Sequence, residues 1–144
     1  MLDVINETFQ LNRVDLRGYS PLALAFIGDS VFATVVKAVL IEHGNCSGGK
    51  LHKRSSRYVC AGAQAKMYDL WETMLTEEES DLLRRGRNAK SENTAKHATD
   101  EEYRKATGVE CLCGYLFLKG EERRLTELIR EGMKSVGEGD SSVI

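Results

Sequence analysis

The feature that most constrains the fold is a long apolar stretch, 20–36, with one acid near its middle. Ser20 and Pro21 are typical of a helix start, because a hydroxyl caps free N–H groups and proline has no N–H to satisfy. The residues that follow are apolar almost all the way round, which predicts a helix at the centre of a globular core. Asp29 is the exception. Burying an unpaired carboxylate costs several kcal/mol, so we expect Asp29 to be neutral, paired or bound to a metal.

The length and composition fit one globular domain. The 144 residues can bury one core but not two comfortable ones, and 42% of them are hydrophobic and 29% charged. A single proline favours helices over a loop-rich β protein. We expect one domain over residues 1–136, followed by a frayed tail of Gly, Ser and acidic residues over 137–144.

The apolar run over 22–41 is about as long as a membrane span. It contains Asp29 and Lys37 and is interrupted by small polar residues, so we prefer a buried helix and expect no membrane. Residues 1–9 carry two acids and lack the pattern of a signal peptide. The cysteines form no CxxC pair, which predicts reduced thiols in a cytoplasmic protein. They are Cys46, Cys60, Cys111 and Cys113.

Periodicity and turn residues predict an all-α architecture of six or seven helices. The first, over 2–12, should turn Leu2, Ile5, Phe9 and Leu11 inward. Thr76 and Glu79 have the spacing of a capping box, which predicts a helix ending near 86–88. A polar surface loop should follow over 88–99. Further helices are expected over 20–42, with a stop at Gly44, and over 51–58, 59–75 and 121–133. One more should run from Thr99 or Asp100 to a stop at Gly120.

A second apolar helix, expected around 106–118, also carries an isolated acid, Glu110. Glycine lies close to both acids, at Gly28 and Gly114, and would let two backbones approach closely. Two carboxylates converging between packed helices would make an oxygen-rich site suited to Mg²⁺. Two alternatives stay open from the spacing alone: either acid could pair with Arg or Lys, or lie at the seam of a dimer.

Basic residues gather in two tracts of a chain whose net charge is −2. Such tracts are typical of a phosphate-binding surface, although solvated helix faces have the same composition. Arg and Asn beside free backbone amides suit the phosphates and ribose hydroxyls of A-form RNA, and the scarcity of aromatics favours a duplex over single strands. The predicted RNA contacts are Lys50, His52, Lys53, Arg54, Arg57 and Lys66 in the first tract, and Arg84, Arg85, Arg87, Asn88 and Lys90 in the second.

Four separated segments, in order, resemble ribonuclease III. Residues 24–31 (Leu-Ala-Phe-Ile-Gly-Asp-Ser-Val) resemble the signature helix of that family, and residues 110–116 (Glu-Cys-Leu-Cys-Gly-Tyr-Leu) resemble its second acidic helix. Residues 59–65 and 85–90 resemble stretches typical of the Mini-III branch. The resemblance covers residues 15–132.

The resemblance implies an all-helical, homodimeric endoribonuclease domain that cleaves double-stranded RNA with Mg²⁺ and leaves 5′-phosphate and 3′-hydroxyl ends. Asp29 and Glu110 would be the catalytic residues and metal ligands. Members of the branch lack a separate double-stranded-RNA-binding domain, and their substrate class is the precursor of 23S ribosomal RNA.

The chain departs from the full-length enzymes at two acidic positions. Ala25 stands where they have a Glu four residues before the signature Asp, and Thr107 replaces an acid three residues before the second-helix Glu. With fewer carboxylates, Mg²⁺ would keep more waters or borrow RNA phosphates as ligands. These losses leave a non-catalytic RNA-binding or assembly protein as the alternative. A hydrolase of small phosphate esters would need further carboxylates, which Glu72, Glu77, Glu78 and Glu79 do not offer on a buried helix.

Overall fold

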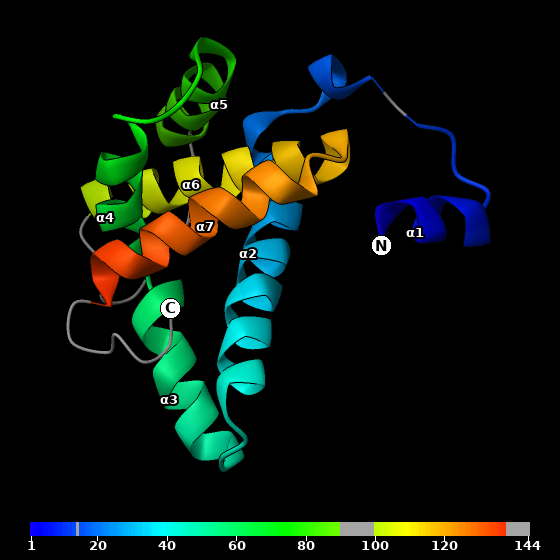
Figure 1. Cartoon of the computed structure of the whole chain (residues 1–144). Helices are drawn as coiled ribbons and strands as arrows, with labels where there is room; N and C mark the ends of the chain where they lie inside the picture. Colours follow the sequence, from blue (N-terminus) through cyan, green and yellow to red (C-terminus); the bar gives the residue numbers. More distant parts are fainter. Residues whose placement is uncertain (14, 90–99, 138–144) are drawn as a thin grey trace.

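The computed structural model describes residues 1–13, 15–89 and 100–137, and every regular element in these ranges is a helix (Figure 1). The predicted all-α fold class is therefore confirmed. The elements are α1 (Leu2–Thr8), the 3-10 turn η1 (Leu16–Gly18), α2 (Pro21–His43), α3 (Gly48–Val59), α4 (Ala61–Trp71), α5 (Glu77–Asn88), α6 (Asp100–Lys119) and α7 (Glu122–Val136).

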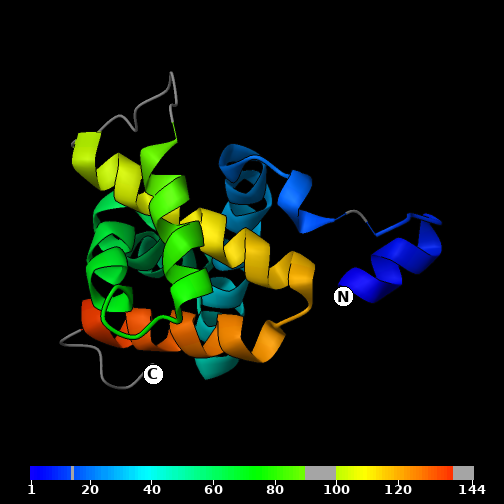
Figure 2. The same ribbon diagram turned by 90° about the horizontal axis from the view of Figure 1, so that it is seen from above.

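Helix α6 is the centre of the fold, because α2, α4, α5 and α7 all pack against it. Figure 2 shows α5 crossing over α6, with α7 along another side. Val109, Cys111 and Leu112 have no exposed surface at all. Each buried side chain of Leu size contributes about 1.5–3 kcal/mol relative to an exposed one. The apolar character of α6 on all sides is thus explained by helical neighbours around it.

The helix starts and stops that the sequence signals are present. The Ser20 hydroxyl accepts a hydrogen bond from the Ala23 N–H at 3.1 Å, one turn into α2. The capping box before α5 is complete: Thr76 Oγ1 accepts from the Glu79 N–H at 3.2 Å, and Glu79 Oε1 accepts from the Thr76 N–H at 2.9 Å. Gly120 follows α6 at a φ of 85°, a left-handed conformation that favours glycine.

Polar contacts of Arg124 and Trp71 attach α7 to the rest of the core. The buried carboxylate of Glu79 accepts hydrogen bonds from Arg124 Nε at 2.8 Å and Arg124 Nη2 at 2.9 Å. The Arg124 guanidinium lowers the pKa of Glu79, against the opposing effect of burial. Trp71, fully buried at the end of α4, donates its indole N–H to the Leu128 carbonyl at 3.0 Å. These contacts fix α7 against both α4 and α5.

The predicted boundaries around residue 60 need correction. Helix α3 begins earlier than expected, at Gly48, because the Ser47 hydroxyl accepts from the Lys50 N–H at 3.3 Å and so caps it. The break between α3 and α4 falls at Cys60, whose backbone is extended. Helix α4 ends at Trp71, before the predicted limit of 75. Of the predicted loop over 88–99 and tail over 137–144, residues 90–99 and 138–144 lie outside the described ranges.

The prediction that the apolar side chains of the first helix turn inward is wrong. Leu2 packs against the core, but Phe9 is 70% exposed and Leu11 54%, and Ile5 is also exposed. The start of the chain touches the bundle, since the Met1 amino group pairs with Glu122 of α7 at 3.6 Å. From there α1 projects away from the bundle (Figure 1), and Ile5, Phe9 and Leu11 stay exposed.

The prediction of a fully buried α2 is also wrong. Within the described chain, α2 is the one helix with the length and composition of a membrane span, and only 33% of its most apolar window is buried. One face packs on α6 through Leu24, Phe32 and Val36. The outer face exposes apolar side chains, of which Phe26 is 82% exposed. In α2, unlike α6, the all-round apolar pattern therefore belongs to a helix that is buried on one side and uncovered on the other.

Candidate active site

Helices α2 and α6 touch through their backbones at two glycines. A Cβ atom on Gly28 would lie 1.7 Å from the Glu110 carbonyl oxygen, and one on Gly114 would lie 1.9 Å from the Leu24 carbonyl oxygen. Both distances are far inside van der Waals contact, so only glycine fits at either position. The prediction that these glycines permit close approach is confirmed. The contact sets Asp29, the next residue on α2, beside Glu110 on α6.

The electrostatics of Glu110 reflect that proximity. The pKa of Glu110 is raised to about 8, first because burial penalises the charged form and then because the negative charge of Asp29 acts on it. The structure therefore brings the two predicted acids together. Asp29 itself is exposed on the outer face of α2, which corrects the expectation of a carboxylate inside the core. It can be reached from solvent, while Glu110 stands half-buried behind it.

The acid pair fits a divalent cation by its chemistry. Burial and the neighbouring negative charge keep one carboxylate of such a pair protonated. A cation between the two carboxylates stabilises the form in which both are ionised. Within the described ranges, no group of three or more His, Cys, Asp or Glu side chains is placed to hold a metal. An ion here would have two protein carboxylates and would complete its shell with water, as Mg²⁺ readily does.

The two positions without acids offer no replacement carboxylate. Ala25 is buried on the inner face of α2. Thr107 is buried too, and its hydroxyl donates to the Tyr103 carbonyl one turn back in α6, at 3.0 Å. That internal bond engages the hydroxyl proton and holds the side chain against its own helix. Neither position therefore adds a carboxylate to the pair formed by Asp29 and Glu110.

The second basic tract lies on the part of α5 that packs against α6 near Glu110. A Cβ on Gly86 would be 2.5 Å from the Cys111 Cβ, so α5 and α6 are also in close backbone contact. The charge of Arg85 acts on the Cys111 thiol, lowering its pKa against the burial that raises it to about 12. Arg85 thus lies on the side of α6 that carries Cys111, the residue after Glu110.

Sequence reasoning missed Tyr68, a buried side chain that lies near the second basic tract. Tyr68 is buried on α4, and a Cβ on Gly108 of α6 would be 2.9 Å from its ring. The positive charge of Arg87 is near enough to lower the pKa of the Tyr68 hydroxyl, which burial raises. In a one-dimensional pattern Tyr68 is indistinguishable from an ordinary core aromatic, so no signal could have singled it out.

The remaining predicted RNA contacts divide between two regions. Arg84 pairs with Asp81 at 3.3 Å, and both Arg84 and Asn88 are exposed on α5. Lys50, His52, Lys53 and Arg57 are exposed on α3, Lys66 is exposed on α4, and Arg54 is half-buried. Figure 1 shows α3 and α5 on opposite sides of α6, so the α3 residues of the first tract lie apart from the α5 residues of the second. Lys90 lies outside the described residues. All four cysteines are free thiols, as predicted.

Comparison with known proteins identifies the family. A model of the ribonuclease III domain matches residues 22–121, most of the chain. The chain belongs to the ribonuclease III family. It is 43% identical to the Mini-ribonuclease 3 of Brevibacillus brevis over 122 residues, 85% of this chain and 90% of that protein. It is 38% identical to the Mini-ribonuclease 3 of Thermoanaerobacter over 138 residues, 96% of this chain and 97% of that protein.

A solved structure gives the same result for the fold. The crystal structure of a Fusobacterium nucleatum protein matches with a TM-score of 0.75 at 28% identity, covering 83% of this chain and 96% of that one. The predicted ribonuclease III fold and Mini-III branch are thereby confirmed, and the chain is an endoribonuclease. The match over 22–121 includes Asp29 and Glu110, and it ends shortly before α7.

Proposed function

We propose that Asp29 and Glu110 form the catalytic centre of this ribonuclease III enzyme and hold Mg²⁺, directly or through its waters. The observation that carries the proposal is the glycine contact of α2 with α6, which sets Asp29 beside a Glu110 whose pKa is raised to about 8. A bound cation would shift Glu110 to its ionised form. Maintaining such a pair destabilises the metal-free fold, and this cost has a functional reason only if the pair binds a cation.

The residues around the pair define what each contributes. When bound, Mg²⁺ supplies Lewis-acid stabilisation of the scissile phosphate and of the leaving 3′ oxygen and activates a water. Asp29, exposed on α2, is the carboxylate that substrate and water can reach first. Glu110, half-buried, supplies a charge in a less polar environment, where its attraction for a cation is stronger. Hydrolysis at this position leaves 5′-phosphate and 3′-hydroxyl ends.

The basic residues bind the RNA backbone. Arg85 and Arg87 lie on α5, where Arg85 is near Cys111 of α6 and Arg87 near Tyr68 of α4, and would hold phosphates of the bound duplex. The α3 residues lie across α6 from them and would contact the duplex farther along its length, with Lys50, His52 and Lys53 the exposed members nearest the start of that helix. This separation suits a long, regular ligand such as an RNA duplex.

A homodimer is part of the same proposal. The outer face of α2 exposes Leu22 and Phe26, and Asp29 is exposed on the same helix. A large exposed aromatic side chain in an apolar face is typical of a protein interface. Pairing two copies of this face would bury it in an isologous contact. Each acid pair would then sit close to the dimer interface, and two cuts on opposite strands would give a staggered end.

The substrate we propose is a stem of the 23S ribosomal RNA precursor, the class known for the Mini-III branch. The relatives named Mini-ribonuclease 3 support this assignment through their extensive similarity. A cytoplasmic location belongs to the same proposal, since ribosomal RNA is processed where ribosomes are assembled. The division into a catalytic domain over 1–136 and a tail over 137–144 stays a prediction.

The test is cleavage of a defined RNA duplex with Mg²⁺, with product ends mapped. Asp29→Asn and Glu110→Gln should each lower the rate at least about 100-fold, because a metal contribution of several kcal/mol is lost. Glu42→Gln, an exposed acid on the same helix α2, is the matched control and should cleave normally. Full activity of either site variant contradicts the assignment. A parent chain that binds duplex without cutting it would favour the non-catalytic alternative.

A further inference from the structure

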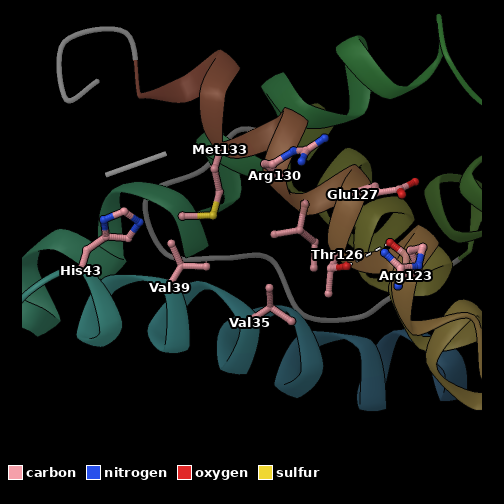
Figure 3. Close-up of a pocket in the computed structure, with 9 residues that line it drawn as sticks. Val35, Val39, His43, Arg123, Thr126, Glu127, Arg130 and Met133 are labelled. Atoms are coloured by element: carbon pink, nitrogen blue, oxygen red, sulfur yellow. Dashed lines mark hydrogen bonds between the residues drawn. The ribbon is translucent and has the colours of Figure 1, made fainter. Parts of the chain in front are cut away.

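The sides of α2 differ in what lies against them. One side packs on α6 through Leu24, Phe32 and Val36. Toward the C-terminal end of the helix, Val35 and Val39 lie opposite α7 side chains across a groove of about 440 Å³ (Figure 3). The remaining side, which we call the outer face, exposes Leu22, Phe26, Asp29, Lys37 and Ile41.

The outer face forms one continuous stripe along α2. At 100° per residue, its five side chains all lie within about 60° of Phe26 around the helix axis. Half-buried Ala33 belongs to the same stripe, near its middle. The large apolar members are Leu22, Phe26 and Ile41, and Phe26 is 82% exposed. An apolar stripe of this kind is typical of a surface that packs against another protein.

Two opposite charges interrupt the stripe. From Pro21 to Ile41, Asp29 and Lys37 are the only charged residues of α2. Neither forms an ion pair with any described part of the chain. They cannot pair with each other inside one subunit, because eight residues of helix separate them by about 12 Å along the axis. A partner for this face should therefore bring a cation to Asp29 and an anion to Lys37.

A second copy of this chain brings both charges. In an isologous contact, a residue of one subunit that meets a second residue of the partner is itself met there in the reverse sense. If two α2 helices run antiparallel with Ala33 on the two-fold axis, Asp29 lies opposite the partner's Lys37, because both are four residues from Ala33. By symmetry Lys37 lies opposite the partner's Asp29. Opposite charges then meet twice in each dimer.

The same register covers exposed apolar side chains. Phe26 lies seven residues before Ala33, and Ile41 lies eight residues after it. Phe26 therefore meets the partner's Ile41 with an offset of only about 1.5 Å, the rise of one residue. Both side chains are exposed in the single chain and would be buried by this contact. Charge and apolar burial thus favour one and the same register.

Other arrangements of the two helices are less favourable. With Phe26 on the two-fold axis, Lys37 and Ile41 would extend beyond Pro21, where the partner's α2 begins, and would stay uncovered by that helix. A parallel pair of helices would set like charges opposite each other, which is repulsive. Of these arrangements, the antiparallel one centred on Ala33 is the one that satisfies both the charges and the apolar side chains.

We propose that Lys37 of each subunit pairs with the exposed carboxylate of Asp29 in a second copy of this chain. The proposal rests on the homodimer proposed above and names the residues that fix its register. It also makes each acid pair an arrangement of two subunits, because the ammonium group of the partner's Lys37 borders the carboxylate of Asp29. Lys37 is thus a positioning residue for the partner's site, and that site is complete only in the dimer.

The first experiment measures the dimer dissociation constant by sedimentation equilibrium. Lys37→Asp sets carboxylates opposite each other at both contacts and should raise the constant at least about tenfold. Asp29→Lys should raise it similarly. Asp29→Lys/Lys37→Asp restores opposite charges in reversed order and should return the constant to within about threefold of the parent. Lys66→Asp makes the same charge change on an exposed position of α4 and should alter the constant less than about twofold.

The double variant gives the decisive comparison. If it dimerises as weakly as Lys37→Asp, or if Lys66→Asp weakens the dimer as much as Lys37→Asp does, the pairing is overturned. Both altered positions of α2 are exposed, so the variants should keep the helical content of the parent in circular dichroism. The dissociation constant is measured without RNA or metal, so the result does not depend on the catalytic role proposed for Asp29.

The second experiment locates the contact. A carbodiimide joins a carboxylate to an amine in contact with it, as an amide without a spacer. In a mixture of heavy- and light-isotope chains, mass spectrometry should find Asp29 joined to the partner's Lys37. The ion pair of Lys105 with Asp69, at 2.7 Å within one subunit, is the control for coupling. A dimer in which the control pair is joined and Asp29 and Lys37 are not overturns the proposal and leaves the homodimer standing, whereas a monomeric parent refutes both.

Discussion

Gly28→Ala should damage both the fold and the acid pair, although alanine is the better helix former. The added Cβ would lie 1.7 Å from the Glu110 carbonyl oxygen and 2.7 Å from the Gly114 nitrogen. Reaching even the shortest separation that such atoms adopt requires α2 and α6 to part by about 1.3 Å. Alanine gains about 1 kcal/mol of helix propensity. Overpacking costs about 1–3 kcal/mol where side chains can adjust, and here the obstacle is backbone. We expect a net loss of about 2 kcal/mol or more.

The measurement is urea unfolding followed by circular dichroism, together with the Mg²⁺-dependent cleavage rate under conditions where the variant is folded. A displacement of about 1 Å between Asp29 and Glu110 should lower that rate about 100-fold. Gly49→Ala is the control, since a Cβ there has nothing within 4 Å, and it should unfold at the same or slightly higher urea concentration. If Gly28→Ala were as stable and active as Gly49→Ala, the backbone contact would not be what positions the acids.

Three further predictions concern buried polar groups. In EDTA and between pH 4.5 and about 8, the folded chain should keep a proton on Glu110 that the unfolded chain has already lost. The free energy of unfolding should therefore fall as pH rises through this window. Glu110→Gln should remove that dependence in thermal unfolding at a series of pH values, and an unchanged slope would contradict the raised pKa. Arg124→Met leaves the Glu79 carboxylate buried without its cation and should cost about 3 kcal/mol in urea unfolding, against a negligible loss for Arg123→Met. Gln64 is buried, and its Nε2 has no hydrogen-bond partner within the described residues, so Gln64→Met should be neutral or stabilising in the same assay, and a loss above about 1 kcal/mol would reveal a hidden partner.

The local signals in the sequence were reliable where they specify hydrogen bonds. The capping box at Thr76 and Glu79 and the serine–proline start of α2 each satisfy free N–H groups within one turn, so neighbouring residues suffice to predict them. The glycines beside Asp29 and Glu110 were informative for a similar reason: a glycine inside a helix is unfavourable unless another backbone comes close. From these residues the pairing of α2 with α6, and hence the acid pair, could be anticipated.

What the sequence could not reveal is which apolar faces this chain covers by itself. The outer side of α2 and the apolar side of α1 have the same composition as core helices, and periodicity does not say whether another helix of the chain covers a given side. The pattern therefore predicts an interior position for Phe26 and Phe9, and both are exposed. The place of Arg85 beside Cys111 was equally hidden, since it depends on how α5 crosses α6.

The single tryptophan has a practical consequence for following this protein in solution. Trp71 is fully buried between α4 and α7, with its indole N–H bonded to the Leu128 carbonyl. Its emission should be blue-shifted in the native chain and should move to longer wavelength when α7 separates from α4. Since no other indole contributes, the tryptophan emission reports the contact between α4 and α7 and does not report the contact between α2 and α6. Comparing its transition with far-ultraviolet dichroism would show whether the helical bundle unfolds as one cooperative unit.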